Sequence, residues 1–423
     1  MRKVTVMISI KPILKIVMKK LLAAVLFIGV YSCTDKNVQE DPFVVEEFDA
    51  VTVSKTNPMK VYAHYMPWFF SKNFDGQWGS HWTMANANPD DTVDGKAIIA
   101  SHIYPQIGPY SSNDPDVLEY HFLLMKYSGL DGILIDWYGT QQLYDYPQLL
   151  QATNKARTHL SKTGLDYAVV YEDRTLQSNA SNDTSMQRQL AEADLQYLKT
   201  RYFSDSNYIH INASPLLAVF GPIVIENPSV WGRIFNNTSV NPTFLTLWGE
   251  GNDAGIETDG EYAWIWNGGS NHYQLVSSFY DNSAVSFKMG VAYPGFDDYY
   301  QEGGWGNGLG WEIEPNNGAT LKSLLDLALQ KNLTHLQIAT WNDFGEATSI
   351  EPSLEYGTSY LEEIQSFTGV GFGKAELTLI KELYEKRKLF KNDPLLQMKL
   401  DQVYYYLISL QVTKAEDLLL EVN

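Results

Sequence analysis

The feature that most constrains the fold is a regular alternation of short apolar runs with longer helical patterns. Eight runs of strand length occur, at Val61–Tyr65, Gly132–Asp136, Tyr167–Tyr171, Leu216–Phe220, Phe244–Trp248, Tyr262–Trp266, Phe287–Ala292 and Leu336–Trp341. Helical patterns separate most of them, at Val117–Tyr127, Tyr146–Ser161, Thr184–Arg201, Pro228–Phe235, His272–Tyr280 and Ala319–Lys331. Alternation of this kind predicts βα units around a parallel sheet. Eight such units close naturally into a (β/α)8 barrel, an α/β fold.

The competing fold is an open, doubly wound sheet. Against it, no glycine-rich phosphate-binding fingerprint follows the first run, Val61–Tyr65. The fifth and sixth runs are the weakest strand predictions. From Lys374 onward the pattern is purely helical, so we expect a barrel over residues 60–370 and a C-terminal helical appendage over residues 371–423.

The first 59 residues indicate export. Residues 1–32 contain a basic start, Met18-Lys19-Lys20, and an apolar stretch, Leu21–Tyr31, of signal-peptide length. Val30-Tyr31-Ser32-Cys33 is similar to a bacterial lipobox, which implies lipidation of Cys33 and attachment to the outer membrane of the cell envelope, periplasmic or surface-exposed. Residues 33–59 would then be a flexible tether, because they are polar and acidic with little periodicity. Met1 and Met18 both remain candidate start residues, and a stray cysteine is the alternative at position 33.

Charge and cysteine content exclude several classes of protein. The formal net charge is −19, and nucleic acid as a partner is disfavoured because phosphate binding needs a basic face. A single cysteine permits no intrachain disulfide. The 11 Trp, 27 Tyr and 18 Phe suit stacking on sugar rings, and they suit core packing equally well.

Polar and aromatic side chains gather at the ends of the predicted strands, where the active site of a barrel lies. The candidates for substrate binding are Tyr65, Trp68, His81, Trp82, Asp136, Trp137, Tyr138, Tyr171, Glu172, Tyr293 and Asn342. Acids, amides and rings suit a neutral polyol, whereas a phosphorylated substrate would need cations, of which Arg174 is the one candidate. No metal-binding spacing such as HExxH occurs, so neither a metal nor another cofactor is expected.

The last apolar run ends in two carboxylic acids, Asp343 and Glu346, within the sequence LQIATWNDFGEATSIEP. One acid can protonate a leaving oxygen while a second carboxylate acts as base or nucleophile, as glycoside hydrolysis requires. The alternative is that Asn342 or Asp343 caps a helix and Glu346 lies in its first turn, with no chemistry involved.

These motifs resemble two glycoside hydrolase families. Trp341-Asn342-Asp343-Phe344-Gly345-Glu346 is similar to the signature of family 71, the α-1,3-glucanases, and the stretch through Ile350-Glu351-Pro352 is similar to family 99, the endo-α-mannosidases and endo-α-mannanases. Further matches to family 99 are Tyr65-Met66-Pro67-Trp68, His81-Trp82, Gly108-Pro109-Tyr110, Asp114-Pro115, Asp136-Trp137-Tyr138-Gly139, Tyr171-Glu172-Asp173 and Tyr293-Pro294-Gly295. The resemblance implies a (β/α)8 barrel that cuts α-linked glycans without a metal.

The resemblance also implies roles for the two acids. Glu346 matches the general acid of both families, and we expect it to be protonated near neutral pH because of apolar neighbours and the charge of Asp343. Family 99 has Glu at the position of Asp343, where it deprotonates the 2-hydroxyl group of the sugar. The shorter Asp343 makes an inverting reaction through a water molecule at least as plausible.

We therefore expect a monomeric lipoprotein glycoside hydrolase acting on an α-linked oligosaccharide or polysaccharide. One alternative is a carbohydrate-binding lipoprotein that no longer cleaves its ligand. Another is a scaffold protein that functions through its C-terminal helices.

Overall fold

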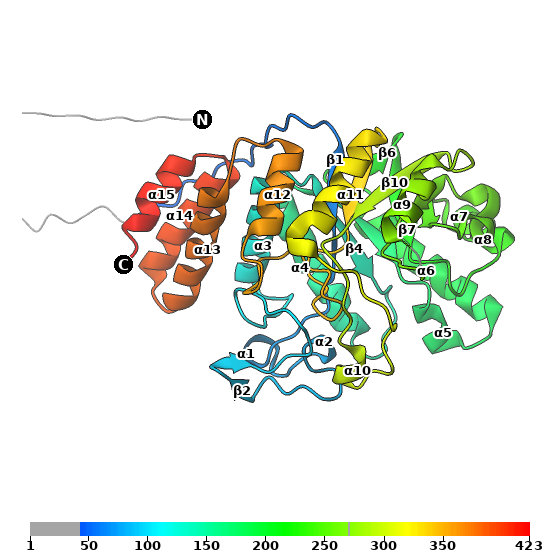
Figure 1. The fold of residues 1–423 in the computed structure, drawn as a ribbon, viewed down its shortest axis with the longest axis horizontal. Coiled ribbons are helices and arrows are strands. Elements are labelled where there is room, and N and C mark those ends of the chain that lie inside the picture. The colour runs from blue at the N-terminus through cyan, green and yellow to red at the C-terminus, as the bar shows by residue number, and fades with distance from the viewer. Residues whose placement is uncertain (1–42, 270) are drawn as a thin grey trace, which may run out of the picture. The chain divides into compact units, whose positions relative to one another are not determined.

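Eight parallel strands close into a barrel in the computed structural model, which describes residues 43–269 and 271–423 (Figure 1). They are β1 (Lys60–Tyr65), β4 (Gly132–Trp137), β5 (Asp166–Tyr171), β7 (Ser214–Val219), β8 (Thr243–Leu247), β9 (Gly260–Tyr262), β10 (Phe287–Ala292) and β11 (His335–Ile338). Neighbours in the chain pair in parallel, and β1 pairs with β11 as well as with β4, so the sheet has no open edge between first and last strand. The predicted (β/α)8 barrel is confirmed, and the open sheet is excluded.

Two strands end several residues earlier than the sequence pattern predicts. β9 stops at Tyr262 and β11 at Ile338, although their apolar runs continue to Trp266 and Trp341. Three further short strands lie outside the barrel, namely β2 (Thr92–Val93), β3 (Lys96–Ala97) and β6 (His210–Ile211). The apolar residues beyond the strand ends are therefore in loops at the carboxyl end of the barrel.

Helices cover most of the outer wall of the barrel. The longer ones are α3 (Pro115–Tyr127), α4 (Tyr146–Thr163), α6 (Thr184–Arg201), α7 (Pro228–Thr238), α9 (His272–Asp281), α11 (Ala319–Gln330) and α12 (Ser359–Thr368). Their starts follow capping chemistry: the side chain of Asp114 accepts a hydrogen bond from the backbone of Asp116, and Pro115 occupies the first turn. The predicted helices are all present.

Short helices lie in the connections between these longer elements. They are α1 (Lys72–Asp75), α2 (Ser80–Thr83), α5 (Thr175–Ala180), α8 (Gly251–Ala254), η1 (Gly255–Glu257), α10 (Tyr300–Gly303) and η2 (Asn316–Gly318). The loop after β1 lies beside the loop after β10, because the backbone N–H groups of Ala85 and Asn86 both donate to the carbonyl of Gly303 (Figure 1).

The C-terminal helices are joined to the barrel by a buried ionic contact. They are α13 (Lys374–Leu389), α14 (Pro394–Ile408) and α15 (Val412–Leu420). Arg387 of α13 is buried, with Nε 2.7 Å from Oε1 of Glu119 on α3 and Nη1 2.8 Å from Oδ1 of Asp401 on α14. The appendage is therefore packed on the barrel and forms one compact unit with it.

The expected tether over residues 33–59 is wrong for the part that the structure describes. Residues 43–59 have no regular secondary structure, yet they are hydrogen-bonded to the C-terminal helices. The amide and carbonyl of Glu46 pair with the side chain of Gln402, and the N–H of Val51 donates to the carbonyl of Ile408. Repeated backbone contacts of this kind fix an extended segment without requiring periodicity in its sequence.

The predicted signal peptide, residues 1–32, and the predicted lipidation site, Cys33, lie outside the described residues. Within residues 43–269 and 271–423, no helix is both long enough and apolar enough to cross a membrane.

Candidate active site

The loop after β11 folds back on itself and holds the two acids in place. Thr340 anchors it twice, since its Oγ1 accepts from the N–H of Asp343 at 2.7 Å and its carbonyl accepts from the N–H of Ile350 at 3.1 Å. Oδ1 of Asp343 accepts a hydrogen bond from the N–H of Glu346 at 3.3 Å. That bond resembles a helix cap, but a turn follows, and the next helix, α12, begins only at Ser359. The capping alternative is therefore wrong.

Both acids lie in a poorly solvated environment. Asp343 is 5% exposed and Glu346 is half-buried. Burial raises the pKa of Asp343 well above its ordinary value, and the charge of Glu346 raises it further. Burial also raises the pKa of Glu346. Each carboxyl group therefore binds a proton more readily than a free carboxylate does, and together they can hold one proton between them.

Burial is the main cause of the raised pKa of Glu346, as expected, and the charge of Asp298 adds to it. The repulsion between Glu346 and Asp343 acts on the same pair and raises the pKa of Asp343. A hydrogen bond from Tyr300 has the opposite effect: Oη of Tyr300 donates to Oε1 of Glu346 at 2.6 Å and stabilises the ionised form. Tyr300 lies in α10, after β10, and no sequence motif singles it out.

Two predicted binding residues instead brace this loop from behind. Asn342 is fully buried: its Oδ1 accepts from the N–H of Met66, and its Nδ2 donates to the carbonyl of Met66 and to Oη of Tyr110. Tyr65 is also fully buried, with its Oη 3.2 Å from Nδ1 of His121. The prediction that Asn342 and Tyr65 contact substrate is therefore wrong, because no part of either side chain is accessible.

A buried carboxylate links these two residues. Oε2 of Glu351 accepts a hydrogen bond from Oη of Tyr110 at 2.7 Å and lies 3.3 Å from Nε2 of His121. The resulting network connects the loop after β11 with the loop after β1 and with α3. It fixes the backbone from which Asp343 and Glu346 project.

A second pair of carboxyl groups lies at the ends of β4 and β5. Asp136 and Glu172 are both nearly buried, and Nε of Arg174 lies 2.7 Å from Oε2 of Glu172. Burial, followed by the charge of Glu172, raises the pKa of Asp136, and Asp343 adds a smaller contribution. Burial raises the pKa of Glu172 to about 7 against the opposing charge of Arg174. The charges of Glu172 and Asp343 therefore both act on Asp136.

Aromatic rings from the loop after β1 form the next part of the site. The ring of His81 stacks on Trp68 with centroids 3.9 Å apart and planes 4° apart, and Trp305 meets His81 edge-on at 5.3 Å. Burial lowers the pKa of His81 to about 3, so this imidazole is neutral. Trp305 is 42% exposed and was missed because it lies in a glycine-rich loop without a recognisable motif. Trp82, a predicted binding residue, is fully buried and donates from Nε1 to the carbonyl of Tyr110, so that prediction is wrong.

Three further predicted binding residues are core residues. Trp137, Tyr171 and Tyr293 are all at most 1% exposed. Oη of Tyr171 donates to Oδ2 of Asp194 at 2.7 Å, and Oη of Tyr293 lies 3.0 Å from Nδ1 of His272. Their rings fill the space between the barrel and its helices, so they cannot contact a ligand. Tyr138, the fourth aromatic prediction in this region, is half-buried.

No group of three or more His, Cys, Asp or Glu side chains that could hold a metal ion occurs within the residues that the structure describes.

Comparisons with known proteins identify the family of the chain. The family model described as glycosyl hydrolase family 99 matches residues 57–365. The chain is 24% identical over 358 residues to the mouse (Mus musculus) glycoprotein endo-alpha-1,2-mannosidase, covering 74% of this chain and 73% of that protein. It is 23% identical over 337 residues to the human (Homo sapiens) glycoprotein endo-alpha-1,2-mannosidase-like protein, covering 70% of this chain and 68% of that protein.

A solved structure shows the same fold. The GH99 endo-alpha-mannosidase from Bacteroides thetaiotaomicron superposes with a TM-score of 0.59 at 19% identity, covering 74% of this chain and 96% of that one. The family match extends over well more than half of the chain and includes every strand of the barrel and both acids after β11. The chain therefore belongs to glycosyl hydrolase family 99 and is a glycoside hydrolase.

Proposed function

We propose that this glycoside hydrolase acts as a monomer and cleaves α-mannosidic bonds in an α-linked glycan, with Glu346 as the general acid and Asp343 as the general base. The observation that carries the proposal is the pair of poorly solvated carboxyl groups on one braced loop after β11, of which Glu346 has the raised pKa that a general acid needs. The names of the relatives, endo-mannosidases, support the choice of mannose.

In the proposed reaction, Glu346 donates its proton to the glycosidic oxygen as the bond to the anomeric carbon breaks. The carboxylate that remains accepts the hydrogen bond of Tyr300, which stabilises the charge that has developed. Asp343 takes a proton from a water molecule, whose oxygen attacks the anomeric carbon from the opposite face. The product then has inverted configuration.

We propose an attacking water molecule because of the length and the hydrogen bonding of the Asp343 side chain. Its side chain is one carbon shorter than the Glu of the family 99 pattern, and its Oδ1 is engaged by the backbone N–H of Glu346. Both features draw the carboxyl group back toward its own loop. In the proposed reaction, a water molecule lies between this carboxylate and the sugar.

The substrate contacts that remain as proposals lie on the other strand ends. Asp136, which lies beside Glu172 at the end of β4, is proposed to hydrogen-bond a sugar hydroxyl. Glu172, Tyr138 and the stacked pair of Trp68 and His81 are proposed to contact the sugar from neighbouring strands. Because all of these groups are neutral or acidic, they suit an uncharged polyol.

The direct test is hydrolysis of soluble α-mannan by the wild-type protein and by Glu346→Gln and Asp343→Asn, with α-1,3-glucan as the second substrate. Loss of either group is expected to reduce kcat by roughly a thousandfold, the range for a single acid or base. Activity that survives both substitutions would remove the mechanism. Activity on α-1,3-glucan alone would replace mannose with glucose as the substrate sugar.

The alternative proposal, glycan binding without cleavage, is favoured by one observation, the shorter Asp343. It predicts that calorimetry detects binding of α-linked oligosaccharides while prolonged incubation releases no reducing ends. Deletion of Lys374–Asn423 without loss of sugar cleavage would count against a scaffold role for the C-terminal helices.

We also propose that the protein is lipid-anchored to the outer membrane through Cys33, supported by the lipobox-like sequence Val30-Tyr31-Ser32-Cys33. Metabolic labelling with radioactive palmitate is expected to mark the wild-type protein and not Cys33→Ser. Equal labelling of both would contradict the anchor.

A further inference from the structure

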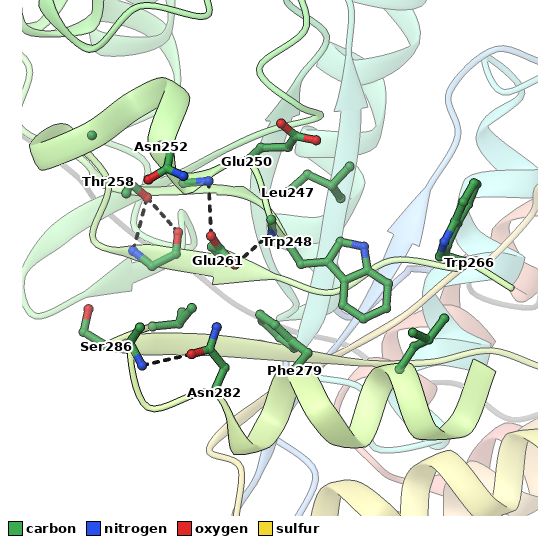
Figure 2. Close-up of a pocket in the computed structure, with 17 residues that line it drawn as sticks. Leu247, Trp248, Glu250, Asn252, Thr258, Glu261, Trp266, Phe279, Asn282 and Ser286 are labelled. Carbon is green, nitrogen blue, oxygen red and sulfur yellow. Dashed lines mark hydrogen bonds between the residues drawn. The ribbon is translucent and has the colours of Figure 1, made fainter. Parts of the chain in front are cut away.

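The outer wall of the barrel has a gap next to β9. β8 is followed only by the single turns of α8 and η1, whereas most other barrel strands are followed by helices of ten residues or more. β9 itself has only three residues. Its first residue, Gly260, lies so close to β10 that a Cβ atom there would be 2.1 Å from the carbonyl oxygen of Phe287. The gap is a groove with a volume of about 900 Å³ between α8 and α9, which we call the β9 groove (Figure 2).

Tryptophan rings line the end of the β9 groove that is nearest the active site. Trp248 follows β8 and Trp266 follows β9, so both lie at the carboxyl end of the barrel, and Ser286 marks the opposite end (Figure 2). Trp266 is 49% exposed. Trp248 is half-buried and packs edge-on against Phe279 of α9 with ring centroids 5.6 Å apart. Two accessible indoles on one rim are unusual for residues that serve only as core.

A line of aromatic rings connects this rim with the catalytic loop. Trp266 meets Trp311 at 5.8 Å, and Trp311 stacks on Phe296 at 4.1 Å. The residue after Phe296, Asp297, donates its N–H to the carbonyl of Glu346 at 2.9 Å. The groove therefore opens onto the same end of the barrel as the proposed acid, a few rings away from it.

The polar groups in the β9 groove suit hydroxyl groups. Both carboxylate oxygens of Glu261 accept hydrogen bonds from backbone N–H groups, at 3.0 Å from Gly249 and 3.1 Å from Gly251, and each keeps a further lone pair. Oδ1 of Asn282 accepts from the N–H of Ala284, so its amide nitrogen is available as a donor. Fixed acceptors and donors beside rings are the usual composition of a site for a neutral polar ligand.

Charge excludes the main alternative ligands. None of the 17 residues that line the groove is basic, and Glu250 and Glu261 are acidic. Burial, together with a hydrogen bond to Asp253 and its charge, raises the pKa of Glu250. An anionic polymer or a nucleic acid would be repelled by these groups, whereas an uncharged sugar chain would not.

We propose that the β9 groove is a second binding site for a neutral, α-linked oligosaccharide segment, through which the enzyme holds a long glycan while another part of the same chain lies at the active site. The inference rests on the proposed function, because it takes its ligand from the glycan that the active site would cleave. It predicts that long chains bind more tightly than short ones through effective concentration, without any change at the acids.

Binding to soluble α-mannan in native affinity gels tests the proposal. The measurements use the full protein with Glu346→Gln, so that the polymer is not degraded. Trp266→Ala and Trp248→Ala, each added to this background, are expected to bind α-mannan roughly tenfold more weakly, as loss of one stacked ring in a bivalent contact predicts. Trp266 is half-exposed, so its substitution keeps the test valid if Trp248→Ala does not fold.

The control is Phe74→Ala, which removes another exposed ring from α1 and is expected to leave binding of α-mannan unchanged. With Glu346 restored, cleavage of a short α-linked oligosaccharide should keep its kcat in the groove variants, while KM for the polymer rises. The proposal is overturned if α-mannan retards the groove variants as strongly as it retards the Glu346→Gln parent. It is also overturned if α-mannan does not retard the parent. Because binding is measured without turnover, failure of the proposed hydrolysis would appear separately, as wild-type protein that binds but releases no sugar.

Discussion

The carboxyl end of the barrel near β11 and the wall near β9 differ in how their polar and aromatic side chains are used. Near β11, the loop that carries Asp343 and Glu346 is braced by buried side chains, and Asn342 uses both polar atoms of its amide. Near β9, the strand is short, the covering helix is reduced to single turns, and Trp266 is left half-exposed. In the first region, the polar side chains form hydrogen bonds that fix the backbone of the loop. In the second region, aromatic rings and hydrogen-bonding groups remain accessible to a ligand.

This difference matches two roles, catalysis by the acids after β11 and glycan binding in the β9 groove. A general acid must be held within a fraction of an ångström of its partner, which requires a rigid supporting network. A site that only holds a flexible sugar chain tolerates looser geometry, because its contribution comes from contact area and from effective concentration. Substitutions in the two regions should therefore differ in stability as well as in activity.

The largest difference is expected between two asparagines, one from each region. Asn342→Ala removes the partner of both backbone groups of Met66 and one of the two partners of the Tyr110 hydroxyl, which should lower the free energy of unfolding by about 2–3 kcal/mol. Asn282→Ala removes one bond from an exposed loop and should cost about 0.5 kcal/mol or less. Chemical denaturation of both variants measures this, and equal losses would remove the contrast between the two regions.

A smaller effect is expected when the hydrogen bond to the acid is removed. Tyr300→Phe should lower kcat roughly tenfold, in line with the loss of one charge-assisted bond of about 1.4 kcal/mol. The bond now lowers the pKa of Glu346, so its loss raises that pKa and keeps the acid protonated to higher pH. The alkaline limb of the profile of kcat/KM against pH should move upward. A downward shift would mean that Glu346 does not act as the acid.

The smallest effect is expected at a residue that the sequence placed in the site. Tyr171→Phe removes one of four donors to the carboxyl group of Asp194, the others coming from Thr140 and Gln141, and should cost about 1 kcal/mol of stability. KM for the glycan should not change, because Tyr171 is fully buried. Thermal unfolding and steady-state kinetics together check this, and an altered KM at unchanged stability would return Tyr171 to the binding site.

The barrel and its acids could be predicted because both leave strong local signals. A buried strand is a run of apolar residues, and the abrupt change from Trp341 to Asp343 marks the end of that run. Asp136 and Glu172 follow the same rule at β4 and β5. The rule predicts which residues lie at the carboxyl end of the barrel.

The rule does not predict in which direction a side chain at a strand end points. Tyr65, Trp137 and Tyr171 are the last residues of their strands, and Tyr293 follows β10. All four point into the protein, because one residue of difference along an extended chain turns a side chain to the other face. Tyr300 and Trp305 are close to Glu346 and His81 only through the folding of a long loop after β10. Contacts of that kind depend on distant parts of the chain and leave no periodic pattern.

The central claim is that Asp343 activates a water molecule while Glu346 protonates the leaving oxygen. Proton magnetic resonance of the sugar released from an α-linked mannan, recorded in the first minutes of the reaction before mutarotation, tests it directly. The account predicts that the β-anomer appears first, because a single displacement by water inverts the α-linkage. If the α-anomer appears first, the reaction retains configuration, and Asp343 acts on the sugar rather than on water.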